Sequence, residues 1–142
     1  MNWKQNYDER QLRARGTAYQ FATLAFILEL FLWCFLRELA IVDAAPLAEL
    51  LILLTPPFVV MLSVCIVKDA YDPIGSRPGL ILFGLMPLTA ILMFLVKINE
   101  HVVLMDGNRI TEDCGIIFLY AAWIIVAAVY WIKLASDRRQ KD

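Results

Sequence analysis

The chain of 142 residues is 61% hydrophobic and 19% charged, whereas soluble domains average about 45–50% apolar and about 25% charged residues. This composition disfavours an ordinary water-soluble domain, and the length predicts a single domain. The formal net charge of −1 provides no positive field for nucleic acid, so we expect no nucleic-acid partner.

Four long apolar segments account for this composition. A helix needs about 20 apolar residues to cross a hydrocarbon core of roughly 30 Å. Segments of this kind occupy residues 17–36, 47–67, 79–96 and 114–134. Each is too long and too uniformly apolar for an amphipathic helix in water. The sequence therefore predicts an all-α fold, an integral membrane four-helix bundle with short connections, in which residues 1–142 form one membrane domain.

Polar segments flank the four spans. Residues 1–16 are predicted to form a cytoplasmic leader and residues 135–142 a cytoplasmic tail. The leader contains good helix formers, and Glu9 and Arg13 have the favourable i,i+4 order. We expect a short helix that either continues into the first span or bends along the membrane surface at Gly16. Three aromatic residues are placed like interfacial belt residues: Tyr19, Trp33 and Trp131.

Basic residues predict the orientation, because Lys and Arg concentrate in the cytoplasmic connections of membrane proteins. Four lie in the leader, two in the connection 68–78 and four at or beyond the end of the last span. The other three lie in the two remaining connections: Arg37, Lys97 and Arg109. Four spans put both termini on one side. The sequence therefore predicts a multi-pass plasma-membrane protein with cytoplasmic N and C termini.

The longest connection, residues 97–113, has the pattern of a small hairpin. Asp106, Gly107 and Asn108 separate two short apolar runs, and a Gly-containing turn is typical of hairpins. An isolated hairpin is marginal in water, so it would lie on the helices or on the headgroups. An ordered cap without a binding role is the simpler interpretation. Contact with a partner or ligand is the alternative, since exposed loops often carry function.

Two acidic residues fall inside the spans. Glu29 lies 12 residues after Thr17, or about 18 Å along the helix, past the midplane. A charged acid near the bilayer centre costs about 2.5–3.5 kcal/mol, so Glu29 should face neighbouring helices, where it can be protonated. Glu49 begins the second span, and no Lys or Arg lies deep in a span to pair with either acid.

Two interpretations of these acids stay open. In the simpler one, Glu29 is protonated and hydrogen-bonded to a neighbouring helix, and Glu49 extends to the headgroups. In the other, the two acids share a proton or hold a cation, because oxygen ligands suit hard ions. Antiparallel neighbouring helices would bring the two acids within one or two turns in depth.

Helix-breaking residues interrupt two spans, with Thr55, Pro56 and Pro57 in the second and Pro87 in the third. Proline removes a backbone donor and clashes with the preceding turn, so both helices should kink. In the second span the freed carbonyls lie near Ile52 and Leu53, and they need partners inside the protein. A structural kink is the simpler interpretation, and a hinge or an ion-coordinating break is the alternative.

No pattern of catalysis or metal binding emerges. The three cysteines, Cys34, Cys65 and Cys114, are widely spaced, and the single histidine is His101, so no metal site of ordinary ligand spacing is expected. The sequence contains no HExxH or GxSxG motif and no phosphate-binding loop. We therefore expect no catalytic residue, no metal and no cofactor, in a protein that is not an enzyme.

Two short segments resemble a known family. Tyr7-Asp8-Glu9-Arg10-Gln11, followed by Arg15-Gly16, precedes the first span, and Lys68-Asp69-Ala70-Tyr71 follows the second. With the four spans, they resemble small uncharacterised membrane proteins of Gram-positive bacteria. The resemblance covers the layout and these two segments, and it implies a bacterial plasma membrane with the two segments as neighbours on the inner face. That family has no assigned activity, so no catalytic residue carries over.

These observations lead to two hypotheses about function. The first is a non-catalytic membrane protein that acts by association, as a subunit, regulator or sensor component. Besides the lipid bilayer, its partner would be another protein or a second copy of the chain. The second is a small oligomeric transporter or channel that uses Glu29 and the proline-kinked helix. The candidate docking residues of the first are Asp8, Glu9, Arg10, Arg13, Lys68, Asp69, Tyr71 and Asp72, of which the first three are proposed to pair with Lys68, Asp69 and Arg77.

Overall fold

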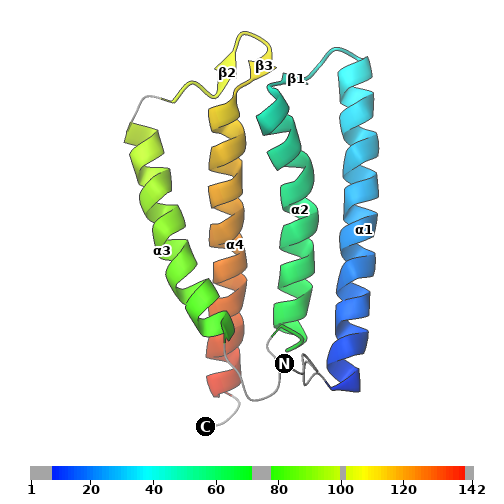
Figure 1. The fold of residues 1–142 in the computed structure, drawn as a ribbon, viewed down its shortest axis with the longest axis vertical. Helices are drawn as coiled ribbons and strands as arrows, with labels where there is room; N and C mark the ends of the chain where they lie inside the picture. The colour runs from blue at the N-terminus through cyan, green and yellow to red at the C-terminus, as the bar shows by residue number, and fades with distance from the viewer. Residues whose placement is uncertain (1–7, 72–77, 100–101, 140–142) are drawn as a thin grey trace, which may run out of the picture.

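A computed structural model describes residues 8–71, 78–99 and 102–139. Within these ranges the chain forms four helices and three two-residue strands (Figure 1): α1 (Glu9–Glu38), β1 (Asp43–Ala44), α2 (Pro46–Val67), α3 (Pro78–Asn99), β2 (Met105–Asp106), β3 (Arg109–Ile110) and α4 (Glu112–Arg139). Helices α1, α2 and α4 are long and apolar enough to cross a membrane, whereas the apolar part described in α3, Pro87–Asn99, is shorter. The chain therefore has the build of a multi-pass membrane protein.

The four helices lie side by side in one row, in the order α1, α2, α4 and α3 (Figure 1). Neighbours in the row are antiparallel except α2 and α4, which run in the same direction. The start of α1, the end of α2, the start of α3 and the end of α4 lie at one end of the row, which we call the termini end. The three strands lie at the opposite end, the sheet end.

The four helices form an open row and not a closed bundle. In a closed bundle every helix packs on two neighbours, but here α1 packs mainly on α2, and α3 mainly on α4. The reason is physical: each span is apolar around its whole circumference, as is typical of helices surrounded by lipid. The hydrophobic pattern therefore does not select which faces meet, and lipid can cover the rest.

Small residues bring α1 and α2 together. Ala14 and Ala18 are buried, and Ala22 and Ala25 continue the same face of α1 as half-buried residues. Spacings of three and four residues keep these side chains on one face. Small residues on such a face let two helices approach closely in a membrane. The leader helix continues into the first span as one helix of 30 residues, without a break at Gly16.

Two of the helices end in the same way. After α1 the N–H of Ala40 donates to the carbonyl of Arg37 and that of Ile41 to Leu36, and Ala40 has a φ of 52°. After α2 the N–H groups of Asp69 and Ala70 make the matching bonds to Ile66 and Cys65, and Asp69 has a φ of 53°. Such paired bonds satisfy the last carbonyls of a helix. They turn the chain sharply at each end of the row.

Helix α4 packs between α2 and α3. Near the sheet end, Gly115 of α4 lies directly against Ala48 of α2. Nearer the termini end, a core cluster joins three helices and consists of Leu62, Ile66, Phe83 and Val126. The Phe83 ring of α3 is 5.2 Å from the Tyr130 ring and 4.7 Å from the Tyr71 ring, between centroids.

The hairpin expected in the longest connection forms, and it pairs with a distant segment. Strands β2 and β3 are antiparallel around a two-residue turn in which Gly107 has a φ of 61°. Glycine adopts this conformation at a lower cost than residues with a Cβ atom. Strand β3 also pairs in parallel with β1, matching Asp43 with Arg109. The small sheet thereby ties the α1–α2 connection to the α3–α4 connection.

Candidate functional site

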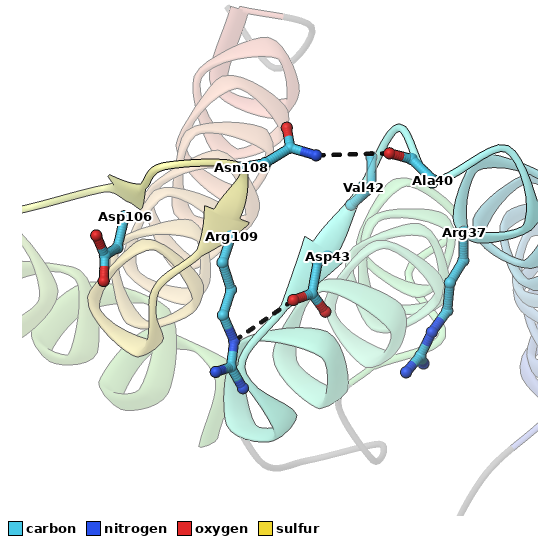
Figure 2. A pocket seen from close by; sticks show the side chains of 7 residues that line it. All are labelled: Arg37, Ala40, Val42, Asp43, Asp106, Asn108 and Arg109. Atoms are coloured by element: carbon cyan, nitrogen blue, oxygen red, sulfur yellow. Dashed lines mark hydrogen bonds and ion pairs between the residues drawn. The ribbon is translucent and has the colours of Figure 1, made fainter.

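A pocket of about 490 Å³ opens at the sheet end, between the α1–α2 connection and the β2–β3 hairpin (Figure 2). It is lined by Arg37, Ala40, Val42, Asp43, Asp106, Asn108 and Arg109. Arg109 Nε lies 3.8 Å from Asp43 Oδ2, and Asn108 Nδ2 donates to the Ala40 carbonyl at 3.5 Å (Figure 2). These contacts hold the two connections together across the pocket.

Every basic side chain described at the sheet end is paired with an acid. Arg37 NH1 is 2.7 Å from Glu49 Oε1, Lys97 Nζ is 2.9 Å from Asp113 Oδ1, and Arg109 is paired with Asp43. The pairs join α1 to α2, α3 to α4, and β1 to β3. Exposed pairs of this kind contribute only about 0–1 kcal/mol each. Their main effect here is to leave no unpaired positive charge at this end, within the described residues.

Glu49 is held by two side chains of α1. Its Oε1 atom accepts hydrogen bonds from Trp33 Nε1 at 2.8 Å and from Arg37 NH1 at 2.7 Å. Trp33 and Arg37 are four residues apart and therefore lie on one face of α1. The sequence placed no Lys or Arg deep in a span beside Glu49, and its basic partner is Arg37 in the last turn of α1, which had been assigned to the connection, as Trp33 had been to the lipid interface. The sequence did contain a signal for this contact. Trp33 and Arg37 are four residues apart on one face of the first helix, and the next helix begins with an acid.

Glu29 lies one turn before Trp33 on the same face of α1. Its Oε2 atom is buried and has no hydrogen-bond partner among the described residues. The two hydrogen bonds to Glu49 Oε1 come from Trp33 and Arg37 and not from Glu29. The described residues also contain no group of three or more residues that could bind a metal ion.

The prolines lie within continuous helices. Helix α2 passes through Pro56 and Pro57, and α3 passes through Pro87, without ending. The buried Thr55 hydroxyl donates to the carbonyl of Leu51, one turn earlier. Because Pro56 and Pro57 lack an N–H, the carbonyls of Ile52 and Leu53 cannot receive their usual helical hydrogen bond.

A network of polar contacts joins three segments at the termini end. Gln11 Nε2 of α1 donates to the backbone carbonyl of Asp69 at 2.8 Å. The Asp69 carboxylate lies 3.3 Å from Lys133 Nζ of α4, which also donates to Asp137 at 2.7 Å. The leader and the segment after α2 are therefore neighbours. The Asp69 carboxylate is paired with Lys133 rather than with Arg10, the partner proposed from the sequence.

The candidate docking residues surround this network. Those that are exposed are Asp8, Glu9, Arg10, Arg13, Lys68 and Asp69. Arg13 NH2 lies 4.0 Å from Glu9 Oε2, which confirms the predicted i,i+4 pair. Tyr71 differs, because it is half-buried and packs on Phe83. Asp72 and Arg77 lie outside the described residues.

Comparisons of the chain with known protein families, with curated proteins and with solved structures find no match. Three features of the chain are therefore the candidates for a functional site: the pocket at the sheet end, the α1–α2 interface around Glu29, and the charged surface at the termini end.

Proposed function

We propose that the chain is a non-catalytic four-span membrane protein that acts by association, with the termini end as a cytoplasmic docking face. The resemblance noted above implies the plasma membrane of a bacterium. The fourth crossing is assigned to α3, which runs between the same two ends of the row as its neighbours. Its 22 residues extend about 33 Å at 1.5 Å per residue, enough for a bilayer core.

The observation that supports docking is the network around Asp69. It fixes α1, the segment after α2 and α4 relative to one another through Gln11 and Lys133. A surface that is ordered before binding loses less conformational entropy when a partner binds. Charged side chains remain exposed beside the network, with Glu9 90% and Arg13 86% exposed. The termini end is therefore a preformed polar surface.

The distribution of charge supports placing this surface in the cytoplasm. The described basic residues of the termini end are Arg10, Arg13, Arg15, Lys68, Lys133, Arg138 and Arg139. The sheet end has only Arg37, Lys97 and Arg109 among the described residues, and all three are paired with acids. Cytoplasmic surfaces of membrane proteins are the ones enriched in Lys and Arg.

Crosslinking with mass spectrometry in native membranes tests the docking face. The test variant carries Arg10→Glu and Lys68→Glu, two charge reversals of exposed residues at the termini end. The control carries Glu38→Arg, a reversal of an exposed residue at the sheet end of α1. We expect crosslinks to a partner protein to be lost in the test variant and retained in the control. Crosslinks that persist unchanged in both variants would contradict the proposal.

A second candidate function is a small oligomeric transporter or channel. The buried Oε2 atom of Glu29, without a partner among the described residues, is the observation that favours it. A row of four helices does not surround a central pathway, so transport would need a second copy of the chain. Ion or proton flux in liposomes that disappears in Glu29→Gln would support transport. Absence of flux from the wild-type protein would argue against it.

A further inference from the structure

Two contacts fix how α1 and α2 are aligned along their length. Gln11 reaches the backbone of Asp69 at the termini end, and Trp33 reaches Glu49 near the sheet end, each at 2.8 Å. Because the two helices are antiparallel, each step along α1 corresponds to a step back along α2. Counting back one turn from the Trp33–Glu49 contact places Glu29 opposite the turn of α2 that contains Ile52 and Leu53.

The residues of this turn also lie on the face of α2 that meets α1. Ile52, Leu53 and Pro56 follow Glu49 by three, four and seven residues, so all three share the face on which Glu49 meets Trp33. The opposite face is occupied by α4, since Ala48 and Leu51 are the neighbours of Gly115. Glu29, four residues before Trp33, lies on the face of α1 that meets α2.

Two kinds of polar group lack a hydrogen-bond partner at this depth. Pro56 and Pro57 leave the carbonyls of Ile52 and Leu53 without a helical donor. Glu29 Oε2 is buried and has no partner among the described residues. In a bilayer no water is available to satisfy such groups. A carboxylate only accepts hydrogen bonds, whereas a protonated carboxyl group also donates one. One proton on Glu29 would therefore provide a hydrogen bond between the carboxyl group and one of these two carbonyls.

We propose that Glu29 and the proline-containing turn of α2 form a proton-binding site, in which the Glu29 carboxyl group holds a proton and donates it in a hydrogen bond to the carbonyl oxygen of Ile52 or Leu53. Toward the sheet end, the first charged residue of α1 after Glu29 is Arg37, and it is paired at 2.7 Å with Glu49 of α2. From Leu50 to Val67, α2 contains no charged residue. Glu29 thus has no counter-charge on the facing helix, and the neutral form avoids burying an uncompensated charge.

Infrared spectroscopy of the protein in liposomes at neutral pH tests whether the proton is present. The wild-type protein should show the C=O stretch of a protonated carboxylic acid, and ¹³C-labelling of the glutamate carboxyl groups should shift that band. The band should disappear in Glu29→Gln, which keeps a hydrogen-bond donor, and remain in the control Glu49→Gln. A wild-type spectrum without the band, or a band that survives in Glu29→Gln, would overturn the proposal.

The acceptor is tested by returning the missing donors to α2. In the double variant Pro56→Ala and Pro57→Ala, new N–H groups can bond to the Ile52 and Leu53 carbonyls. The carboxylic-acid band should then move to higher frequency, because Glu29 loses its acceptor, while Pro87→Ala in α3 leaves the band in place. An unchanged band in the double variant would contradict the proposal that the unsatisfied carbonyls draw the Glu29 proton.

Addition of metal cations tests whether the site binds a proton or a metal ion. Adding sodium or potassium chloride at constant pH should leave the band unchanged if the site takes a proton. Loss of the band on addition of either salt would show that a metal cation replaces the proton and would overturn the assignment. The site is independent of docking at the termini end, so the Arg10 and Lys68 variants should keep the band.

Discussion

Gly115 marks a close approach of two helices, α2 and α4, that pack against each other. A Cβ atom at this position would lie 2.7 Å from Ala48 Cα and 3.2 Å from Ala48 Cβ. The Ala48 backbone cannot move away without shifting α2, which also carries Glu49 and the contacts to α1. A single methyl group here would therefore disturb the whole α2–α4 interface.

We expect Gly115→Ala to destabilise the protein by about 1–3 kcal/mol, the usual cost of overpacking a tight contact. Gly16→Ala is the matched control, because nothing lies within 4 Å of a Cβ at Gly16. In that helix interior, alanine should stabilise by about 0.5–1 kcal/mol. Unfolding in detergent followed by circular dichroism measures both changes. Equal effects of the two substitutions would show that α2 and α4 do not touch at Gly115.

For single residues, the sequence identified the acids inside the spans but not the side chains that bind them. Glu29 and Glu49 stood out because acids are rare in apolar spans. The donors of Glu49 were missed because Trp33 and Arg37 each had a sufficient local interpretation, at the interface and in a connection. A contact between two helices depends on their rotation and alignment, and neither is encoded in a single short segment.

The helices themselves were largely predictable from the sequence. The second span, expected at residues 47–67, corresponds to α2 at Pro46–Val67, and the third, expected at 79–96, corresponds to α3 at Pro78–Asn99. The first and fourth helices extend beyond the predicted spans into polar sequence, because helix formation does not stop where the apolar run ends. Asp8 begins α1 by accepting from the N–H of Arg10 at 2.8 Å.

Helix α1 exposes most of its apolar surface. Leu28, near the middle of the first span, is 62% exposed, and Leu39, just after the helix, is 52% exposed. In water these two leucines would be equivalent. In a bilayer they differ, because Leu28 would lie in hydrocarbon and Leu39 at the interface.

Leu28→Lys should therefore weaken membrane insertion by about 2.5–3.5 kcal/mol, the cost of lysine at the centre of a span. Leu39→Lys should have a much smaller effect. A membrane insertion assay with glycosylation sites on either side of α1 measures both substitutions. If Leu28→Lys inserted as efficiently as Leu39→Lys, the exposed face of α1 would not face lipid.

For the whole molecule, the arrangement of the helices was not predictable from the sequence. Short connections implied antiparallel neighbours, but the order α1, α2, α4, α3 depends on specific contacts such as Gly115 against Ala48. The pairing of β1 with β3 joins Asp43 to Arg109. Two-residue strands so far apart in the sequence have no recognisable local pattern. The turn of the hairpin does have one, because it contains Gly107.

The two ends of the row differ in charge as well as in structure. The sheet end is closed by three strands and by pairs between acids and each described basic residue. The termini end carries the larger share of basic residues, next to the Asp69–Lys133 contact. This asymmetry is the physical basis for our proposal that the termini end lies in the cytoplasm and the sheet end outside.

Cysteine labelling in intact cells tests this placement most directly. In a chain with Cys34, Cys65 and Cys114 replaced by alanine, Asn108→Cys introduces a thiol at the exposed hairpin turn and Ser136→Cys one at the exposed end of α4. A membrane-impermeant maleimide should label Asn108→Cys in intact cells, and Ser136→Cys only after the membrane is opened. Labelling of Ser136→Cys in intact cells, or protection of Asn108→Cys, would contradict the account.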